Sequence, residues 1–278
     1  MRSCIAARAL TALICCVPGW AGAAAPASQA PAAAMQAQAA AIGAKSGADL
    51  SGVWQVSGGV GNEGRGMAAY PQSQWSREEL PFTAEGRKAF VATRPGKGPR
   101  YFNPAAGNDP IGGANPPGLY RTLVYGRPFE FIQLGDKVIQ QFEWGRIWRD
   151  IYTDGRPVPD DVPTGPFWYG YSVGRWEGTT LVATTMALDG RAWFDEWGTP
   201  ISDEARVEER WQRTGPDALQ LQITVRDPKM YTRPWTSVAV SFRRQRRGVE
   251  PGEIIFSPMD ENTFNERIRD PAGSATSR

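Results

Sequence analysis

The chain has 278 residues, a formal net charge of +2 and no histidine, and its three cysteines, Cys4, Cys15 and Cys16, all lie near the N-terminus. This composition excludes imidazole as a general base or metal ligand, and it excludes thiol chemistry in the rest of the chain. We therefore expect no metal ion and no cofactor, and the small net charge gives no electrostatic signature of nucleic-acid binding.

The first 48 residues predict export. Residues 1–25 combine two early arginines, an apolar run at 10–17 and the sequence Ala-Gly-Ala at 21–23, which together are typical of a cleaved signal peptide. The apolar run is too short to span a bilayer, so we expect no transmembrane segment and a periplasmic or secreted protein. Residues 26–48 are rich in alanine and proline and predict a disordered linker.

The folded domain is expected at residues 49–257, with little helix. Thr83 is a suitable N-cap for a helix over residues 84–92, which prolines bound on both sides. Residues 94–120 are rich in proline, glycine and asparagine and predict a long surface loop, a kind of segment that often carries function. The polar residues 258–278 predict a tail that covers part of the surface.

Beyond residue 123 the chain predicts a succession of strands. Between residues 219 and 225 apolar and polar side chains alternate, which indicates a half-buried antiparallel strand. About nine such segments with short connections favour an all-β antiparallel meander. We expect a closed or partly closed barrel of the calycin or lipocalin type, because closure removes exposed strand edges. The clearest expected strands are 129–133, 138–144, 147–153, 171–176, 181–187, 206–211, 219–225 and 238–242.

Most side chains that could take part in catalysis or ligand binding lie between residues 143 and 211. Tyrosine and carboxylate side chains can transfer protons without imidazole, and the candidate catalytic residues are Tyr171, Asp189 and Glu208. Arginine donates paired hydrogen bonds to carboxylates and stacks on aromatic rings, and tyrosine and tryptophan offer flat apolar surface. The candidate ligand-binding residues are therefore Arg149, Tyr152, Trp193, Arg210 and Trp211. Glu208 and Arg210 share one face of an expected strand, which can point either into the barrel or into solvent.

Several stretches resemble a family of exported, largely uncharacterised bacterial proteins. They are PFE at 128–130, RDIYTDGRP at 149–157, SVGRWEG at 172–178 and DPKMYTRPW at 227–235, with weaker likeness at 49–54 and 260–262. The resemblance covers about 200 residues and implies an exported single domain, but no particular reaction. The family's usual histidines are replaced here by Val158, Tyr171 and Ile201, and its usual cysteines by Ala114 and, approximately, Met259.

Three functions remain open at the level of the sequence. The first is an exported barrel that binds a small aromatic or apolar molecule in an interior pocket, since aromatic and arginine side chains are abundant. The second is an isomerase, lyase or hydrolase that acts on such a molecule through tyrosine and carboxylates. The third is a structural envelope protein without a pocket. The sequence does not indicate an oligomeric state.

Overall fold

The computed structural model describes residues 49–57, 72–103, 106–113, 115–246, 248–253 and 265–271. The expected signal peptide and linker, and most of the expected polar tail, lie outside these residues, as do Ala114 and Met259. No helix within the described ranges is long and apolar enough to cross a membrane.

The fold is a closed β-barrel, as expected. Nine strands pair in a ring, in the order β10-β1-β2-β3-β4-β5-β6-β7-β8, and the pairing of β10 with β8 closes the ring. A two-residue strand, β9, pairs with Thr224 and Val225 of β8 beyond the part of β8 that pairs with β10, and is a tenth member of the sheet. The strands are β1 (Gly52–Val56), β2 (Phe129–Gln133), β3 (Lys137–Phe142), β4 (Trp148–Tyr152), β5 (Tyr171–Glu177), β6 (Thr180–Met186), β7 (Arg206–Gly215), β8 (Ala218–Arg226), β9 (Trp235–Thr236) and β10 (Val240–Arg244).

One pair of neighbouring strands, β4 and β5, is parallel, which a simple meander would not contain. All other strand pairings in the described ring are antiparallel. An odd number of strands cannot close with antiparallel pairs alone, because the alternation of directions fails once around the ring. A parallel pair needs a crossover of a dozen or more residues, and residues 153–170 supply it. This segment therefore runs the length of the barrel.

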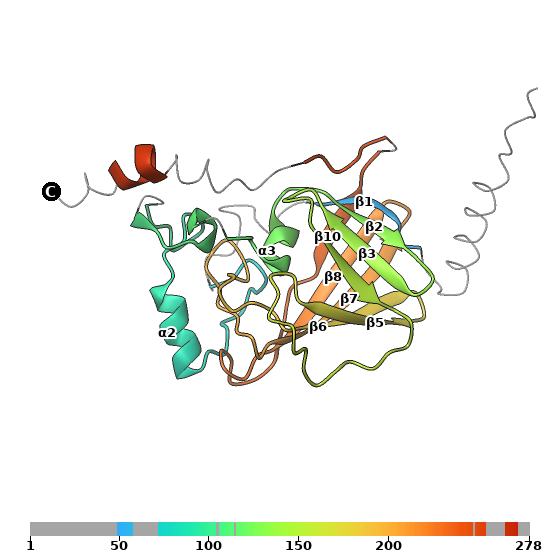
Figure 1. Ribbon diagram of the computed structural model, residues 1–278, viewed down its shortest axis with the longest axis horizontal. Coiled ribbons are helices and arrows are strands. Elements are labelled where there is room, and N and C mark those ends of the chain that lie inside the picture. The colour runs from blue at the N-terminus through green and yellow to red at the C-terminus, as the bar shows by residue number, and fades with distance from the viewer. Residues whose placement is uncertain are drawn as a thin grey trace, which may run out of the picture.

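The two ends of the barrel differ (Figure 1). At one end the strands are joined by tight turns, around Gly135, Gly178 and Pro216. The other end carries both α-helices and the long connections 72–118 and 187–205. We call this second end the capped end. Because loops carry most binding groups in a rigid scaffold, the capped end is where a site is expected.

Two α-helices cover the capped end. Helix α2 (Ala84–Ala92) confirms the expected helix, and its N-cap Thr83 accepts a hydrogen bond from the Gly86 amide at 2.9 Å. Helix α3 (Leu119–Val124) was not expected, since the sequence there was assigned to a loop running into strands. All six of its residues are buried, so no amphipathic pattern marks it. Two further turns of helix lie at Pro110–Gly113 and Asn265–Arg269.

Side chains pack the barrel interior. Phe129 contacts the rings of Phe131, Phe142, Trp211 and Phe242 at centroid distances between 5.2 and 5.9 Å in mostly edge-to-face geometry. These rings are 0–1% exposed. Where these rings meet, the barrel interior is a packed core, and the interior pocket expected from the sequence is not shown.

Candidate functional site

A cavity of about 440 Å³ lies outside the packed interior, at the rim of the capped end. Its walls come from the loop after α2, from α3, from the turn between β3 and β4, and from the connection between β6 and β7. Its volume falls in the range of small-molecule pockets. We call it the rim cavity, and it is lined by Gly96, Lys97, Asp109, Ile111, Arg121, Tyr125, Gly126, Arg127, Trp144 and Glu196.

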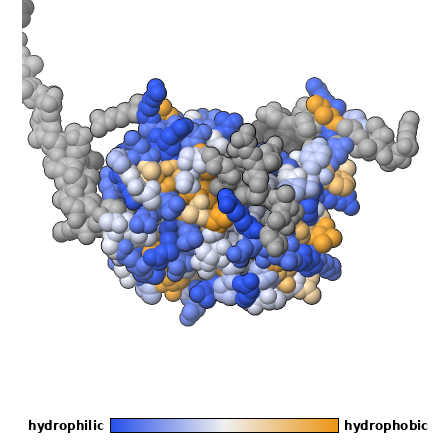
Figure 2. Space-filling model, turned by 180° about the vertical axis from the view of Figure 1, so that it is seen from behind, coloured by the Kyte–Doolittle hydropathy of each residue, from blue (hydrophilic) through white to orange (hydrophobic). Residues whose placement is uncertain are grey.

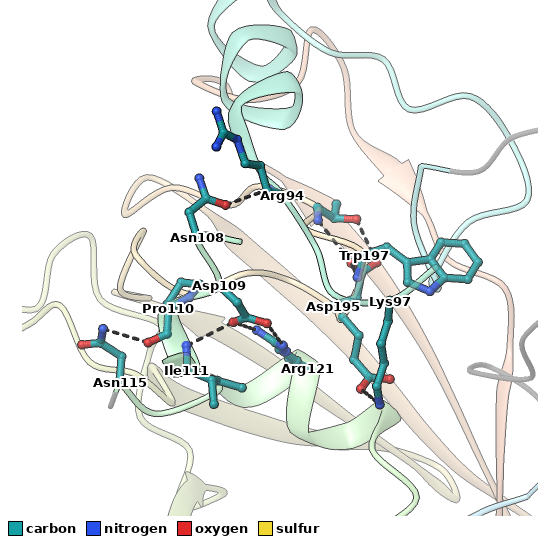
Figure 3. Close-up of polar contacts among 12 residues, drawn as sticks. Arg94, Lys97, Asn108, Asp109, Pro110, Ile111, Asn115, Arg121, Asp195 and Trp197 are labelled. Atoms are coloured by element: carbon teal, nitrogen blue, oxygen red, sulfur yellow. Dashed lines mark hydrogen bonds and ion pairs between the residues drawn. The ribbon is translucent and has the colours of Figure 1, made fainter. Parts of the chain in front are cut away.

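Arg121 is the fixed cation of the rim cavity. It projects from α3 and donates two parallel hydrogen bonds to Asp109, at 2.7 and 2.5 Å, as Figure 3 shows. Its guanidinium also lies 5.4 Å from the Trp193 ring and 5.7 Å from the Tyr125 ring. Burial by itself would lower the pKa of Arg121, but the hydrogen bonds to Asp109 outweigh it and hold the pKa above its usual value. The Nε atom of Arg121 is buried and has no hydrogen-bond partner among the described residues.

A second ion pair borders the cavity. Lys97 Nζ lies 2.6 Å from Glu196 Oε1, and the lysine side chain is 55% exposed whereas the glutamate is 11% exposed. Gln74 Nε2 donates to the other oxygen of Glu196 at 3.3 Å. In Figure 3 the lysine side chain extends from the loop toward this carboxylate, beside the Arg121–Asp109 pair. Glu196 is thus held by two donors, and Lys97 is the more exposed partner of the ion pair.

The apolar wall of the rim cavity is a pair of aromatic rings. Tyr125 and Trp144 lie 5.1 Å apart with their planes tilted by 49°. Burial raises the pKa of the Tyr125 hydroxyl, so this group stays protonated near neutrality. The indole Nε1 of Trp144 is buried and, like Arg121 Nε, lacks an acceptor within the described part of the chain. Buried donors without partners are uncommon and costly in folded proteins.

A separate polar cluster lies inside the barrel. Arg149 and Glu209 form a bidentate ion pair with distances of 2.9 and 2.6 Å, and both side chains are almost fully buried. Tyr120 from α3 and Thr185 also donate to Glu209, as does the indole of Trp211. Burial alone would raise the pKa of Glu209, but the charge of Arg149 and these hydrogen bonds outweigh it, so the pKa lies below its usual value. These contacts tie α3 to β4, β6 and β7 from within.

The structure separates the three candidate catalytic residues. Tyr171 lies on the outer face of the barrel, where its hydroxyl accepts from Arg156 at 3.0 Å. Asp189 pairs with Arg191 at 2.5 Å, and the hydrogen bonds from Arg191 lower the pKa of this carboxyl. Glu208 lies 3.8 Å from Arg210 in an exposed group on the outside of β7. Each of the three is engaged with its own neighbour, in a different place.

The five candidate ligand-binding residues are also dispersed. Arg149 and Trp211 belong to the interior, whereas Arg210 faces solvent and donates to Glu177 at 2.8 Å. Tyr152 lies outside, with the Arg156 guanidinium 3.7 Å from its ring. Trp193 borders a void of only about 10 Å³, too small for any ligand beyond a water molecule. Of the five, Trp193 alone approaches the rim cavity, through its contact with Arg121.

The sequence analysis missed most of the rim cavity. Loop 94–120 was marked as a segment able to carry function, and it does supply Lys97 and Asp109. The residues contributed by α3 and by the β3–β4 turn had no recognisable motif. Glu209 was also overlooked, although its position between Val207 and Trp211, both apolar and two residues away, already places it on the inward face.

Among the described residues, no group of three or more Asp, Glu, His or Cys side chains is placed to hold a metal ion. Comparisons of the chain with models of protein families, with curated proteins and with solved structures give no match.

Proposed function

We propose that this protein is an exported binding protein for a small molecule with a flat apolar part and an anionic or carbonyl oxygen. The ligand occupies the rim cavity. The observation that carries the proposal is the coincidence of two buried donors without acceptors, Arg121 Nε and Trp144 Nε1, in the walls of one cavity of ligand size. Both N–H groups are buried, so the proposal requires that the cavity walls shift on binding and let a ligand oxygen supply the acceptor that these groups lack.

The remaining walls fit such a ligand. Tyr125 and Trp144 offer tilted aromatic faces against which a planar molecule can pack. Lys97 and Arg127 are each 55% exposed, and each is paired with a carboxylate at the rim, at 2.6 and 3.6 Å respectively. Their carboxylate partners, Glu196 and Glu143, are only 11% and 13% exposed, so in each pair the cation is the accessible member and the one that a ligand carboxylate can reach.

Binding is favoured over catalysis by the arrangement of the polar groups. A general acid or base must reach the substrate at hydrogen-bond distance. Tyr171, Asp189 and Glu208 each bond to a separate arginine, so they do not surround one substrate position. The rim cavity instead offers cations and aromatic surface, which hold a ligand without transferring a proton.

The test is calorimetric titration of the protein with a panel of aromatic carboxylates. Replacement of Trp144 by alanine removes one aromatic wall and one donor, and we expect affinity to fall at least about tenfold, or 1.4 kcal/mol. Trp148→Ala is the matched control, because Trp148 is a 65% exposed tryptophan on the outside of β4. Equal affinities of the two variants, or no binding by any member of the panel, would refute the proposal.

Export is tested separately. Fractionation of an expressing bacterium, with N-terminal sequencing of the recovered protein, should find a mature chain that starts near residue 24 outside the cytoplasm. An unprocessed chain that begins at Met1 and stays in the cytoplasm contradicts this part of the proposal and leaves the binding part intact.

A further inference from the structure

The segment from α2 to residue 108 concentrates positive charge. Residues 84–108, which include all of α2, contain five cationic side chains and one acidic one, Glu85, although the whole chain has a net charge of only +2. The five are Arg87, Lys88, Arg94, Lys97 and Arg100. Helix α2 lies on the outside of the capped end, away from the barrel (Figure 1).

Exposed apolar side chains lie in the same segment. Val91 is 68% exposed, Tyr101 63% and Phe102 38%. Val91 follows Lys88 by three residues on α2, so both side chains lie on one face of the helix. In Figure 2, which views the molecule from behind, orange and deep-blue atoms adjoin one another at the right-hand side, where α2 lies in the reversed view.

The loop after α2 brings the aromatic and cationic groups into contact. The guanidinium of Arg94 lies 5.1 Å from the centre of the Phe102 ring, within the range of a cation–π contact. The Phe102 amide donates to the carbonyl of Pro95 at 2.7 Å, which folds the loop back on itself. We call Lys88, Val91, Arg94, Tyr101 and Phe102 the basic–aromatic face.

Three of the five cations have no ion pair within the described ranges, and one of these three, Arg100, is bound by backbone carbonyls. Arg87 pairs with Glu79, Lys97 pairs with Glu196, and Arg100 donates to the backbone carbonyls of Phe90 and Trp197. Lys88 and Arg94 form no ion pair with any residue in the described ranges, and both are exposed. Their charge is therefore available to an external anion.

We infer that the basic–aromatic face binds the surface of a membrane that contains anionic phospholipid. Cations near such a surface each contribute to attraction, while aromatic and aliphatic side chains enter the boundary between headgroups and acyl chains. Val91 favours a lipid surface over single-stranded nucleic acid, because an aliphatic side chain offers no stacking platform to a base. The inference does not depend on what the rim cavity binds.

Sedimentation with lipid vesicles tests this inference on the full chain. We expect binding to phosphatidylcholine vesicles that contain phosphatidylglycerol, weakening with added salt, and little binding to phosphatidylcholine alone. Lys88→Gln with Arg94→Gln should lower the partition coefficient about fivefold for each cation, or roughly 25-fold together. Tyr101→Ser with Phe102→Ser should also lower it, but without changing its dependence on salt.

The matched control is Arg243→Gln with Arg246→Gln. It removes two exposed arginines, one on β10 and one just after it. This control should bind vesicles as the unaltered protein does, and circular dichroism should show that all variants are folded. Equal losses in the control and in the Lys88–Arg94 variant would overturn the inference, since net charge alone would then explain binding. Single-stranded DNA that binds through Lys88 and Arg94 while anionic vesicles do not would also overturn it.

Discussion

Glu209 on β7 lies 2.6 Å from the guanidinium of Arg149 on β4, inside the barrel, and the two side chains are 0% and 2% exposed. Between these strands in the ring lie β5 and β6, which contribute Ser172 and Thr185 to the same cluster. Moving two charges out of water is expensive, and this cost is recovered only with good geometry and satisfied hydrogen bonds. Arg149 and Glu209 meet both conditions, although Nε2 of the adjoining Gln140, whose Oε1 accepts from Arg149, is a buried donor without a partner among the described residues. The two charged side chains should therefore depend strongly on one another.

Removal of one charge of this pair should therefore destabilise the protein severely. We expect Glu209→Gln or Arg149→Met to cost about 3–5 kcal/mol in the free energy of unfolding, since each leaves the other charge buried and unpaired. The double variant should cost less than the sum of the two, by about 2 kcal/mol. Urea-induced unfolding measures all three. The exposed pair of Arg175 and Glu177 is the control, and its removal should leave stability nearly unchanged. Additive effects at Arg149 and Glu209 would show that the two side chains do not depend on each other.

The same carboxylate sets a dependence of stability on pH. Because the pKa of Glu209 is lower in the folded protein than its ordinary value near 4.3, the unfolded chain takes up a proton first as the pH falls. The stabilisation should be complete above about pH 5.5 and decline below about pH 4.5. Asp189, whose pKa is lowered by hydrogen bonds from Arg191, acts in the same direction.

Urea unfolding between pH 3 and 7 measures this effect. With no histidine in the chain, no side chain with an ordinary pKa titrates between pH 5 and 8, so a plateau is expected there. Glu209→Gln should show a shallower decline at acid pH, by at most about 1.4 kcal/mol per pH unit. Identical slopes for the two proteins would mean that Glu209 does not contribute to the acid lability.

Gly86 should not tolerate a methyl group, although it lies in a helix. At an exposed position inside a helix, replacement of glycine by alanine stabilises the helix by about 1 kcal/mol. Here a Cβ atom would lie 2.0 Å from the carbonyl oxygen of Met230, against which α2 is docked. We expect Gly86→Ala to lower the free energy of unfolding by about 1–3 kcal/mol. Gly126→Ala is the control, because nothing lies within 4 Å of its added Cβ; a stabilised Gly86→Ala protein would show that α2 is not docked in this way.

Tyr171→Phe distinguishes the outer face of the barrel from the rim cavity. The change removes the hydroxyl that accepts from Arg156 but keeps the ring that packs 5.6 Å from Tyr152. We expect the affinity for a rim-cavity ligand to be unchanged within error, as measured by calorimetry beside Trp144→Ala. A loss of turnover of at least about tenfold, with affinity retained, would instead support the catalytic hypothesis for Tyr171.

The sequence predicted those parts of the fold that depend on local patterns. Alternation over residues 219–225 located β8, and Thr83 located the start of α2 to the residue. The periodicity of a strand does not show which other strands become its neighbours. The parallel pairing of β4 with β5 could therefore not be predicted from the sequence pattern. Helix α3 has six residues, all buried, and leaves no period of 3.6 to detect.

The candidate site was harder to predict, for a different reason. Asp109 and Arg121 are 12 positions apart, whereas Trp144 and Glu196 come from connections much further along the chain. Only the closing of the barrel brings these loops to one rim. The dense tract of polar and aromatic side chains between 143 and 211 instead divides between the interior and the outer face, because successive side chains of a strand point in opposite directions.

The closure of the ring by β10 has a consequence for incomplete chains. β10 pairs with both β1 and β8, so it is the strand that joins these two sides of the ring. A chain that ends before Val240 would present two unpaired edges at once, on opposite sides of the same gap. Such edges readily recruit strands from other molecules, so the newly made polypeptide stays prone to self-association until β10 has emerged.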